Sequence, residues 1–252
     1  MIQRGLSYGP LDEHRLDFYA ADAPADAPLF VFFHGGGLEG GDRGRGDDPV
    51  FTELARQGIS TATADYRLYP KARFPEFIED AALAVSWCLS NLPHSRLFVG
   101  GSSAGGYLSM MLALDARFLA AHGIDAQDRR QIGGYFCDAG QPTVHYNVLR
   151  ERGLDTRLVR VDEAAPVYHA KPQSDPQKLP LVALVVADGD MVNRLEQNRL
   201  LYRTLLHLGW REDGVSFTLM KGFGHTQYQY ARSEDGEFLY VPMVKKFISD
   251  AR

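Results

Sequence analysis

An apolar segment that runs directly into a glycine-flanked serine is the feature that most restricts the fold of this chain. Residues 96–106 read RLFVGGSSAGG, an apolar strand-forming run followed by Gly101-x-Ser103-x-Gly105. A serine held outward on a sharp strand-to-helix turn needs glycine on both sides, because the neighbouring backbones pass close to it. The start of a following helix adds backbone N–H donors and a favourable dipole for a developing negative charge. The segment therefore predicts a strand, a strained turn and a helix, with Ser103 as a nucleophile.

Two other readings of this segment are weaker. Ser102 is the neighbouring hydroxyl, but the glycine spacing is centred on Ser103, so we expect Ser102 to be structural. A turn of small residues without chemistry is the other alternative, since the bare pentapeptide occurs often by chance. The apolar run before it and the helix-compatible residues 107–115 after it favour the nucleophile.

The rest of the chain alternates short apolar runs with amphipathic segments. This alternation is typical of a mostly parallel sheet with helices on both faces, which is an α/β fold. The expected strands are 29–33, 59–64, 96–100, 133–136, 181–187 and 215–220, and the expected helices are 77–92, 107–115, 195–208 and 240–248. A length of 252 residues suits one large domain, so we expect residues 1–252 to form a single unit.

Two longer stretches, 138–180 and 225–236, show no regular pattern. Long loops in a compact domain are usually lids or binding loops. Residues 138–180 are therefore a candidate lid or specificity insertion. Residues 21–28, rich in alanine, aspartate and proline, predict a turn between an early strand and the first core strand.

A histidine and three glycines, residues 34–37, follow the expected strand 29–33 directly. Successive glycines leave backbone N–H groups unobstructed, as an acyl-transfer enzyme needs them around the oxygen of a tetrahedral intermediate. A phosphate-binding loop is the main alternative, and it is disfavoured because neither GxGxxG nor GxxxxGK[ST] follows. We expect His34 to organise this loop and not to act as a base.

These two motifs together resemble the α/β-hydrolase superfamily, and in particular the hormone-sensitive-lipase-like esterases and related short carboxylesterases such as feruloyl and acetyl esterases. In that group an HGGG loop precedes a GxSAGG turn. Residues 65–70, DYRLYP, look like the family's DYRLAP segment, and Pro75 and Asp80 extend the likeness. The resemblance covers roughly residues 25–250 and implies the α/β-hydrolase fold.

The resemblance also implies site residues. It places an oxyanion hole at the N–H groups of Gly36, Gly37 and Ala104, and it makes residues 65–70 a structural element beside the site. The chain departs from the family where Ser102 stands in place of the usual Asp or Glu. It also has no room for a large N-terminal helical cap, which weakens any inference of a long-chain lipid substrate.

A nucleophilic serine needs a base, and in this fold the partners follow in the order serine, acid, histidine. His207 falls within the expected helix 195–208, and His169 precedes the strand that carries the acid. His225 lies in a glycine-flanked loop just after the strand 215–220. We therefore expect His225 to be the general base, against the alternative of an exposed loop histidine.

The acid belongs in the loop after the strand 181–187, where Asp188 and Asp190 are both candidates. The spacing into the next helix resembles the family's pattern best with Asp190 as the acid. Its carboxylate would orient the imidazole and stabilise the imidazolium. Asp188 takes this role if the turn is one residue tighter, and the other aspartate then forms the turn.

These residues predict a serine carboxylic ester hydrolase that acts on small or short-acyl esters, carbohydrate- or aromatic-linked ones included, by two-step acyl transfer. An arylformamidase-like amidase and a non-catalytic ligand-binding member of the fold are the alternatives. The chemistry requires no metal and no organic cofactor. Aromatic or apolar residues near the expected loop ends are candidates for the pocket or the core: Phe33, Leu38, Tyr107, Tyr135, Tyr146, Phe223 and Tyr228. His145 and residues 228–230 suit a hydroxyl-rich or aromatic leaving group.

The bulk properties restrict the partners and the location. A net charge of −5 without a Lys/Arg stripe argues against nucleic acid or an anionic membrane surface as the main partner, so a neutral small molecule is expected. Cys88 and Cys137 fit no metal or redox spacing and are expected to be free thiols. Without a signal-peptide pattern or an apolar stretch of roughly 20 residues, the cytoplasm is expected, although a chain trimmed of its leader would look the same. The oligomeric state stays open, a homodimer included.

Overall fold

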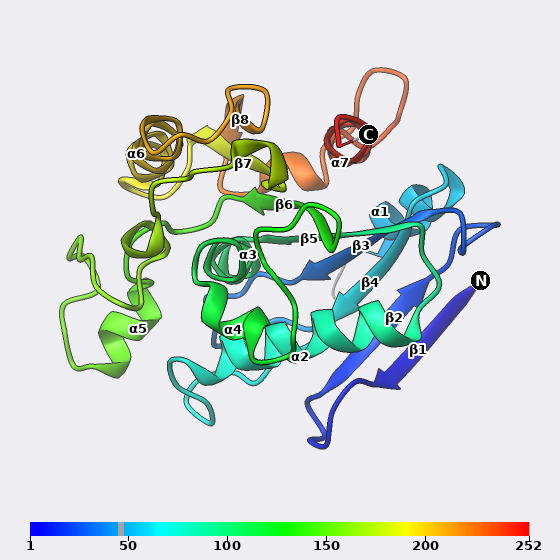
Figure 1. Ribbon diagram of the computed structural model, residues 1–252, viewed down its shortest axis with the longest axis horizontal. Coiled ribbons are helices and arrows are strands. Elements are labelled where there is room, and N and C mark those ends of the chain that lie inside the picture. The colour runs from blue at the N-terminus through cyan, green and yellow to red at the C-terminus, as the bar shows by residue number, and fades with distance from the viewer. Residues whose placement is uncertain (45–47, 252) are drawn as a thin grey trace.

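A twisted eight-stranded sheet forms the centre of the computed structural model, which describes residues 1–44 and 48–251 (Figure 1). Its strand order is β1-β2-β4-β3-β5-β6-β7-β8, with β1 and β8 at the two edges. Among these strands, β2 alone runs in the direction opposite to the other seven. The strands are β1 (Ile2–Ser7), β2 (Arg15–Tyr19), β3 (Pro28–Phe33), β4 (Ser60–Ala64), β5 (Arg96–Ser102), β6 (Ile132–Asp138), β7 (Leu181–Gly189) and β8 (Val215–Gly224).

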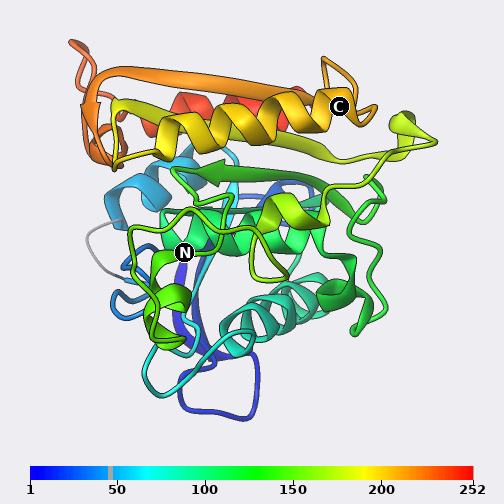
Figure 2. The same ribbon diagram turned by 90° about the vertical axis from the view of Figure 1, so that its left-hand side faces the viewer.

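Helices cover both faces of the sheet, because the inner strands are apolar on both sides. In β3, Leu29, Val31 and Phe33 enter one core, whereas Phe30 and Phe32 enter the other, as the alternation of a strand requires. The first face carries α2 (Glu76–Asn91), α3 (Ala104–Leu114), α4 (Ala116–Ala120) and α6 (Arg194–His207), and the second carries α1 (Asp48–Arg56) and α7 (Tyr240–Ser249). Figure 2 shows α6 lying along β7 and β8.

The expected α/β architecture is confirmed, and each predicted core strand and helix is present within a few residues of its predicted ends. The early strand expected before residues 21–28 is β2. The edge strand β1 was not predicted, because its sequence IQRGLS lacks an apolar pattern and most of its residues stay exposed. Helix α1 was also missed.

The stretch 138–180 is less irregular than expected. It contains α5 (Tyr146–Glu151), whose six residues are too few to show a helical periodicity in the sequence. The side chain of His145 caps this helix by accepting a hydrogen bond from the Asn147 N–H. Two short 3₁₀ helices, Pro166–His169 and Pro176–Lys178, follow before β7 begins.

The two cysteines, Cys88 and Cys137, are buried free thiols, as expected. Burial in apolar surroundings raises the pKa of both thiols above its ordinary value. Within residues 1–44 and 48–251, no helix has the length and apolar character that a membrane crossing demands.

Candidate active site

The strand β5 delivers Ser103 to a strained turn at the start of α3. The backbone angle φ of Ser103 is 57°, a positive value that residues other than glycine rarely adopt. A Cβ atom on Gly101 would lie 2.5 Å from the backbone of Gly105, and one on Gly105 would lie 1.8 Å from the Phe33 carbonyl oxygen. The two flanking glycines are therefore required by close backbone contacts, as the sequence pattern predicted.

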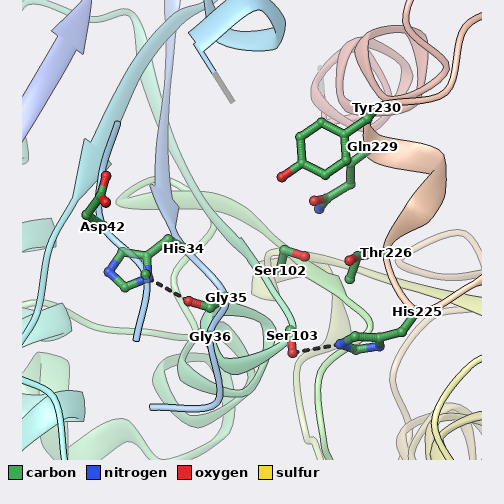
Figure 3. A pocket seen from close by; sticks show the side chains of 11 residues that line it. His34, Gly35, Gly36, Asp42, Ser102, Ser103, His225, Thr226, Gln229 and Tyr230 are labelled. Atoms are coloured by element: carbon green, nitrogen blue, oxygen red, sulfur yellow. Dashed lines mark hydrogen bonds between the residues drawn. The ribbon is translucent and has the colours of Figure 1, made fainter. Parts of the chain in front are cut away.

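The three residues expected to form a triad lie in one chain of hydrogen bonds. His225 follows the last residue of β8, and its Nε2 atom is 2.8 Å from Ser103 Oγ (Figure 3). On the other side of the ring, Nδ1 is 2.6 Å from Asp190 Oδ1. A neutral imidazole that donates from Nδ1 to the carboxylate leaves Nε2 free to accept the serine proton.

Asp190, and not Asp188, lies beside the imidazole. Only 1% of the Asp190 side chain is exposed, and its Oδ1 atom also accepts a hydrogen bond from the Met191 N–H. Burial alone would raise the pKa of Asp190, but the hydrogen bond and the electrostatic interaction with His225 outweigh it and hold the pKa below its ordinary value. The Asp188 carboxylate instead accepts a hydrogen bond from the Gly222 N–H at 2.8 Å, which ties the end of β7 to β8.

The glycine loop passes directly over the nucleophile. A Cβ atom on Gly35 would be 3.3 Å from Ser103 Cβ, and Gly36 and Gly37 both have positive φ, at 112° and 66°. Among the described residues, no acceptor binds the N–H groups of Gly36, Gly37 or Ala104. An N–H group must be free of other acceptors to bind a developing oxyanion.

His34 holds this loop from behind. Its ring stacks on Tyr66 with centroids 4.4 Å apart, and its Nδ1 atom lies 2.7 Å from the Gly35 carbonyl oxygen. Asp65 accepts hydrogen bonds from the backbone and side chain of Arg43, while Arg67 pairs with Asp80. Residues 65–70 thus connect the glycine loop to helix α2, which carries Asp80.

A cleft of about 290 Å³ opens above Ser103. Figure 3 shows His34 and Asp42 on one side of this cleft and Gln229 and Tyr230 on the other. The interpretation of His145 and Tyr228 as contacts for a leaving group is wrong, because both side chains are fully buried. Four other pocket candidates are likewise core residues: Phe33, Leu38, Tyr107 and Tyr135.

A buried carboxylate that the sequence analysis did not single out lies beneath the site. Asp138 is the last residue of β6, and its carboxylate accepts hydrogen bonds from the Tyr228 hydroxyl and the Gln229 amide. Its backbone oxygen accepts the Ser103 N–H at 2.8 Å. Burial raises the pKa of Asp138 to about 7, although these hydrogen bonds oppose the shift. The sequence signal was only an aspartate at the end of a predicted strand, where catalytic groups of this fold gather.

Comparison with known proteins identifies the fold. Residues 30–127 match the model of a family described as "alpha/beta hydrolase fold". The apo form of Thermogutta terrifontis esterase 2 superposes with a TM-score of 0.76 at 20% identity, covering 98% of this chain and 93% of that one. The chain has the α/β-hydrolase fold. A truncated carbohydrate esterase from gut microbiota gives the same TM-score at 16% identity, covering 100% of this chain and 96% of that one.

Several curated proteins are similar to this chain in sequence, as the resemblance of the two motifs predicted. Esterase LipC of Mycobacterium tuberculosis is 33% identical over 121 residues, which are 45% of this chain and 30% of that protein. Human hormone-sensitive lipase is 33% identical over 112 residues, 42% of this chain and 10% of the lipase. Tuliposide A-converting enzyme 1 of Tulipa gesneriana is 24% identical over 242 residues, 88% of this chain and 61% of the enzyme. The chain thus spans less than two thirds of each of these relatives.

Proposed function

We propose that this α/β hydrolase is a serine carboxylic ester hydrolase that acts on small or short-acyl esters, carbohydrate- or aromatic-linked ones among them. The observation that carries the proposal is the hydrogen-bond chain from Ser103 through His225 to Asp190, at 2.8 Å and 2.6 Å. The names of the esterases with which the chain shares sequence and fold support the same reaction class.

In the proposed reaction, His225 Nε2 takes the proton of Ser103 as Oγ attacks the ester carbonyl carbon. The tetrahedral intermediate collapses, the alcohol leaves with the proton from His225, and an acyl group stays on Ser103. A water molecule, deprotonated by the same histidine, then attacks the acyl carbon and releases the acid. Asp190 stays ionised throughout, because its role is to orient the ring and stabilise the imidazolium.

The N–H groups of Gly36, Gly37 and Ala104 would bind the oxygen of the tetrahedral intermediate. These donors need not move during the reaction, because the close packing of the glycine loop against the turn at Ser103 fixes their positions. Loss of one such donor typically lowers kcat about 10²- to 10³-fold. No step of this mechanism requires a metal ion or an organic cofactor.

The segment 138–180 is proposed as the specificity insertion. It contributes Tyr146 beside the glycine loop, where a Cβ atom on Gly37 would meet the Tyr146 hydroxyl at 1.9 Å. The cleft above Ser103 measures only about 290 Å³, which favours a short acyl or a small alcohol group.

The decisive experiment compares Ser103→Ala with the wild type on p-nitrophenyl butyrate. We expect kcat to fall by about 10⁴-fold or more, with an unchanged circular-dichroism spectrum. Ser90→Ala, at an exposed position on α2, is the matched control and should keep full activity. A Ser103→Ala variant that retains most of its turnover would refute the proposal.

The two alternatives give different results. An arylformamidase-like amidase would hydrolyse N-formylkynurenine with a higher kcat/KM than acetyl, butyryl and feruloyl esters, and still depend on Ser103. A non-catalytic ligand-binding protein would hydrolyse none of these compounds and would not be labelled at Ser103 by a fluorophosphonate. The ester assignment requires labelling at Ser103 and a preference for esters.

A further inference from the structure

A second cavity, of about 690 Å³, lies between the segment 138–180 and the start of α6. Its walls include Leu158, Val159, Met191 and Val192, and each of these side chains is more than two fifths exposed. Large apolar side chains left in contact with water around a cavity are typical of a ligand site. We call this space the apolar cavity.

The apolar cavity adjoins the triad. Met191, in its wall, directly follows Asp190 and donates its backbone N–H to that carboxylate at 2.7 Å. Tyr146 also lines the cavity, and its hydroxyl lies against Gly37 of the glycine loop. The apolar cavity therefore lies beside both the acid of the expected triad and the glycine loop.

The charges around the apolar cavity all have one sign. Arg157 and Arg194 line it, whereas no aspartate or glutamate is among the described residues of its wall. Arg157 is exposed and pairs with Asp155 outside the cavity. This arrangement stands out in a chain whose net charge is −5.

Arg194 is the unusual member, because it is buried without an anionic hydrogen-bond partner. It is only 3% exposed, and the acceptors that its guanidinium reaches among the described residues are uncharged: the Ala139 carbonyl oxygen, Gln141 Oε1 and Met191 Sδ. Burial lowers the pKa of Arg194, although the nearby charge of Asp190 opposes this. An arginine nevertheless stays protonated in proteins, so its charge remains. Buried charges are normally paired or bind an ionic ligand.

We propose that the apolar cavity binds a carboxylate-bearing end of the ester substrate. Arg194 binds the carboxylate, and Leu158, Val159 and Met191 contact the hydrocarbon that joins it to the ester. The inference rests on the proposed ester hydrolysis and adds a substrate class to it: esters that carry a negative charge on the acyl or the alcohol side. Guanidinium–carboxylate pairs combine charge with paired hydrogen bonds, which makes such a subsite selective.

Two matched pairs of esters test the substrate class. The first compares p-nitrophenyl hemiglutarate with p-nitrophenyl butyrate, which places the carboxylate on the acyl side. The second compares 4-butyryloxybenzoate with phenyl butyrate, which places it on the alcohol side. We expect a higher kcat/KM for the charged member of one pair, and that pair identifies which end enters the apolar cavity. Absence of such a preference in both pairs would overturn the inference but leave the ester hydrolase intact.

Variants connect the preference to Arg194. Arg194→Gln should reduce the charged-to-neutral ratio of kcat/KM about tenfold to a hundredfold, the range of a charge-assisted hydrogen bond, while Arg194→Lys keeps part of it. Arg203→Gln removes the same charge from an exposed position on α6 and should leave the ratio unchanged. An equal loss of activity on charged and neutral esters in Arg194→Gln would mean that Arg194 only supports the fold.

A binding measurement tests the subsite without turnover, and its first comparison needs no Arg194 variant. In the Ser103→Ala protein, the affinity for monomethyl glutarate should be at least about tenfold higher than that for methyl butyrate, as measured by titration calorimetry. Adding Arg194→Gln should remove this difference. Equal affinities in Ser103→Ala would refute the anionic subsite, whereas failure of the wild type to hydrolyse any ester would refute the proposed function instead.

Discussion

Replacing Asp138 with asparagine should remove a large pH dependence from the folding stability of this protein. The carboxylate is fully buried, and its hydrogen-bond partners, among them Tyr228, Gln229 and Ser102, are neutral side chains. Burial therefore disfavours the charged form and raises the pKa of Asp138 from 3.8 to about 7. An asparagine keeps the size of the side chain, and Gln229 can rotate its amide to offer an oxygen to the new NH₂ group.

The magnitude follows from the difference in pKa between the folded and unfolded chains. A shift of about 3 units at 1.36 kcal/mol per unit corresponds to about 4 kcal/mol. Because the folded-state pKa of Asp138 is the higher one, the folded protein binds this proton more tightly. The stabilising contribution is thus fully present below a pH of about 4 and is lost as the pH rises through about 7.

Urea unfolding followed by circular dichroism at a series of pH values between 5 and 8 measures this effect. The free energy of unfolding of Asp138→Asn should rise relative to the wild type as the pH increases, by roughly 3 kcal/mol over this interval. Asp188→Asn removes an exposed carboxylate and should follow the wild type at every pH. The reasoning would be refuted if the difference in free energy of unfolding between wild type and Asp138→Asn stayed constant within about 1 kcal/mol from pH 5 to 8.

Two further predictions concern catalysis. Asp190→Asn should lower kcat on p-nitrophenyl butyrate by about 10⁴-fold, because the imidazole loses its orienting carboxylate. The control Asp188→Asn should change kcat less than about twofold. Similar losses of kcat in both variants would contradict the assignment of the acid. Gly37→Ala should lower kcat/KM about 10²-fold or more, because the new Cβ atom at φ 66° would lie 1.9 Å from the Tyr146 hydroxyl and displace the glycine loop. Adding Tyr146→Phe removes that oxygen and should restore part of the activity, and an unaltered kcat/KM in Gly37→Ala alone would argue against a role for this loop.

The sequence by itself determined the parts of this protein that depend on neighbouring residues. The turn at Ser103 is one such part, since its strand, its glycines and its helix are contiguous and only glycine fits beside the nucleophile. The core strands were equally readable, because a strand buried on both faces is an unbroken apolar run. Edge strand β1 escaped prediction because most of its residues stay exposed, and helix α5 because its six residues are too few to show a helical periodicity.

Only the tertiary structure decided which distant groups meet. Asp188 and Asp190 are two residues apart, and only the path of the backbone from the end of β7 into the following turn places Asp188 beside Gly222 and Asp190 beside His225. The burial of Asp138 under Tyr228 and the burial of Arg194 beside the apolar cavity likewise join segments far apart in the chain. Local sequence patterns report which backbone conformation a segment adopts, whereas burial, charge pairing and pKa depend on what packs against it.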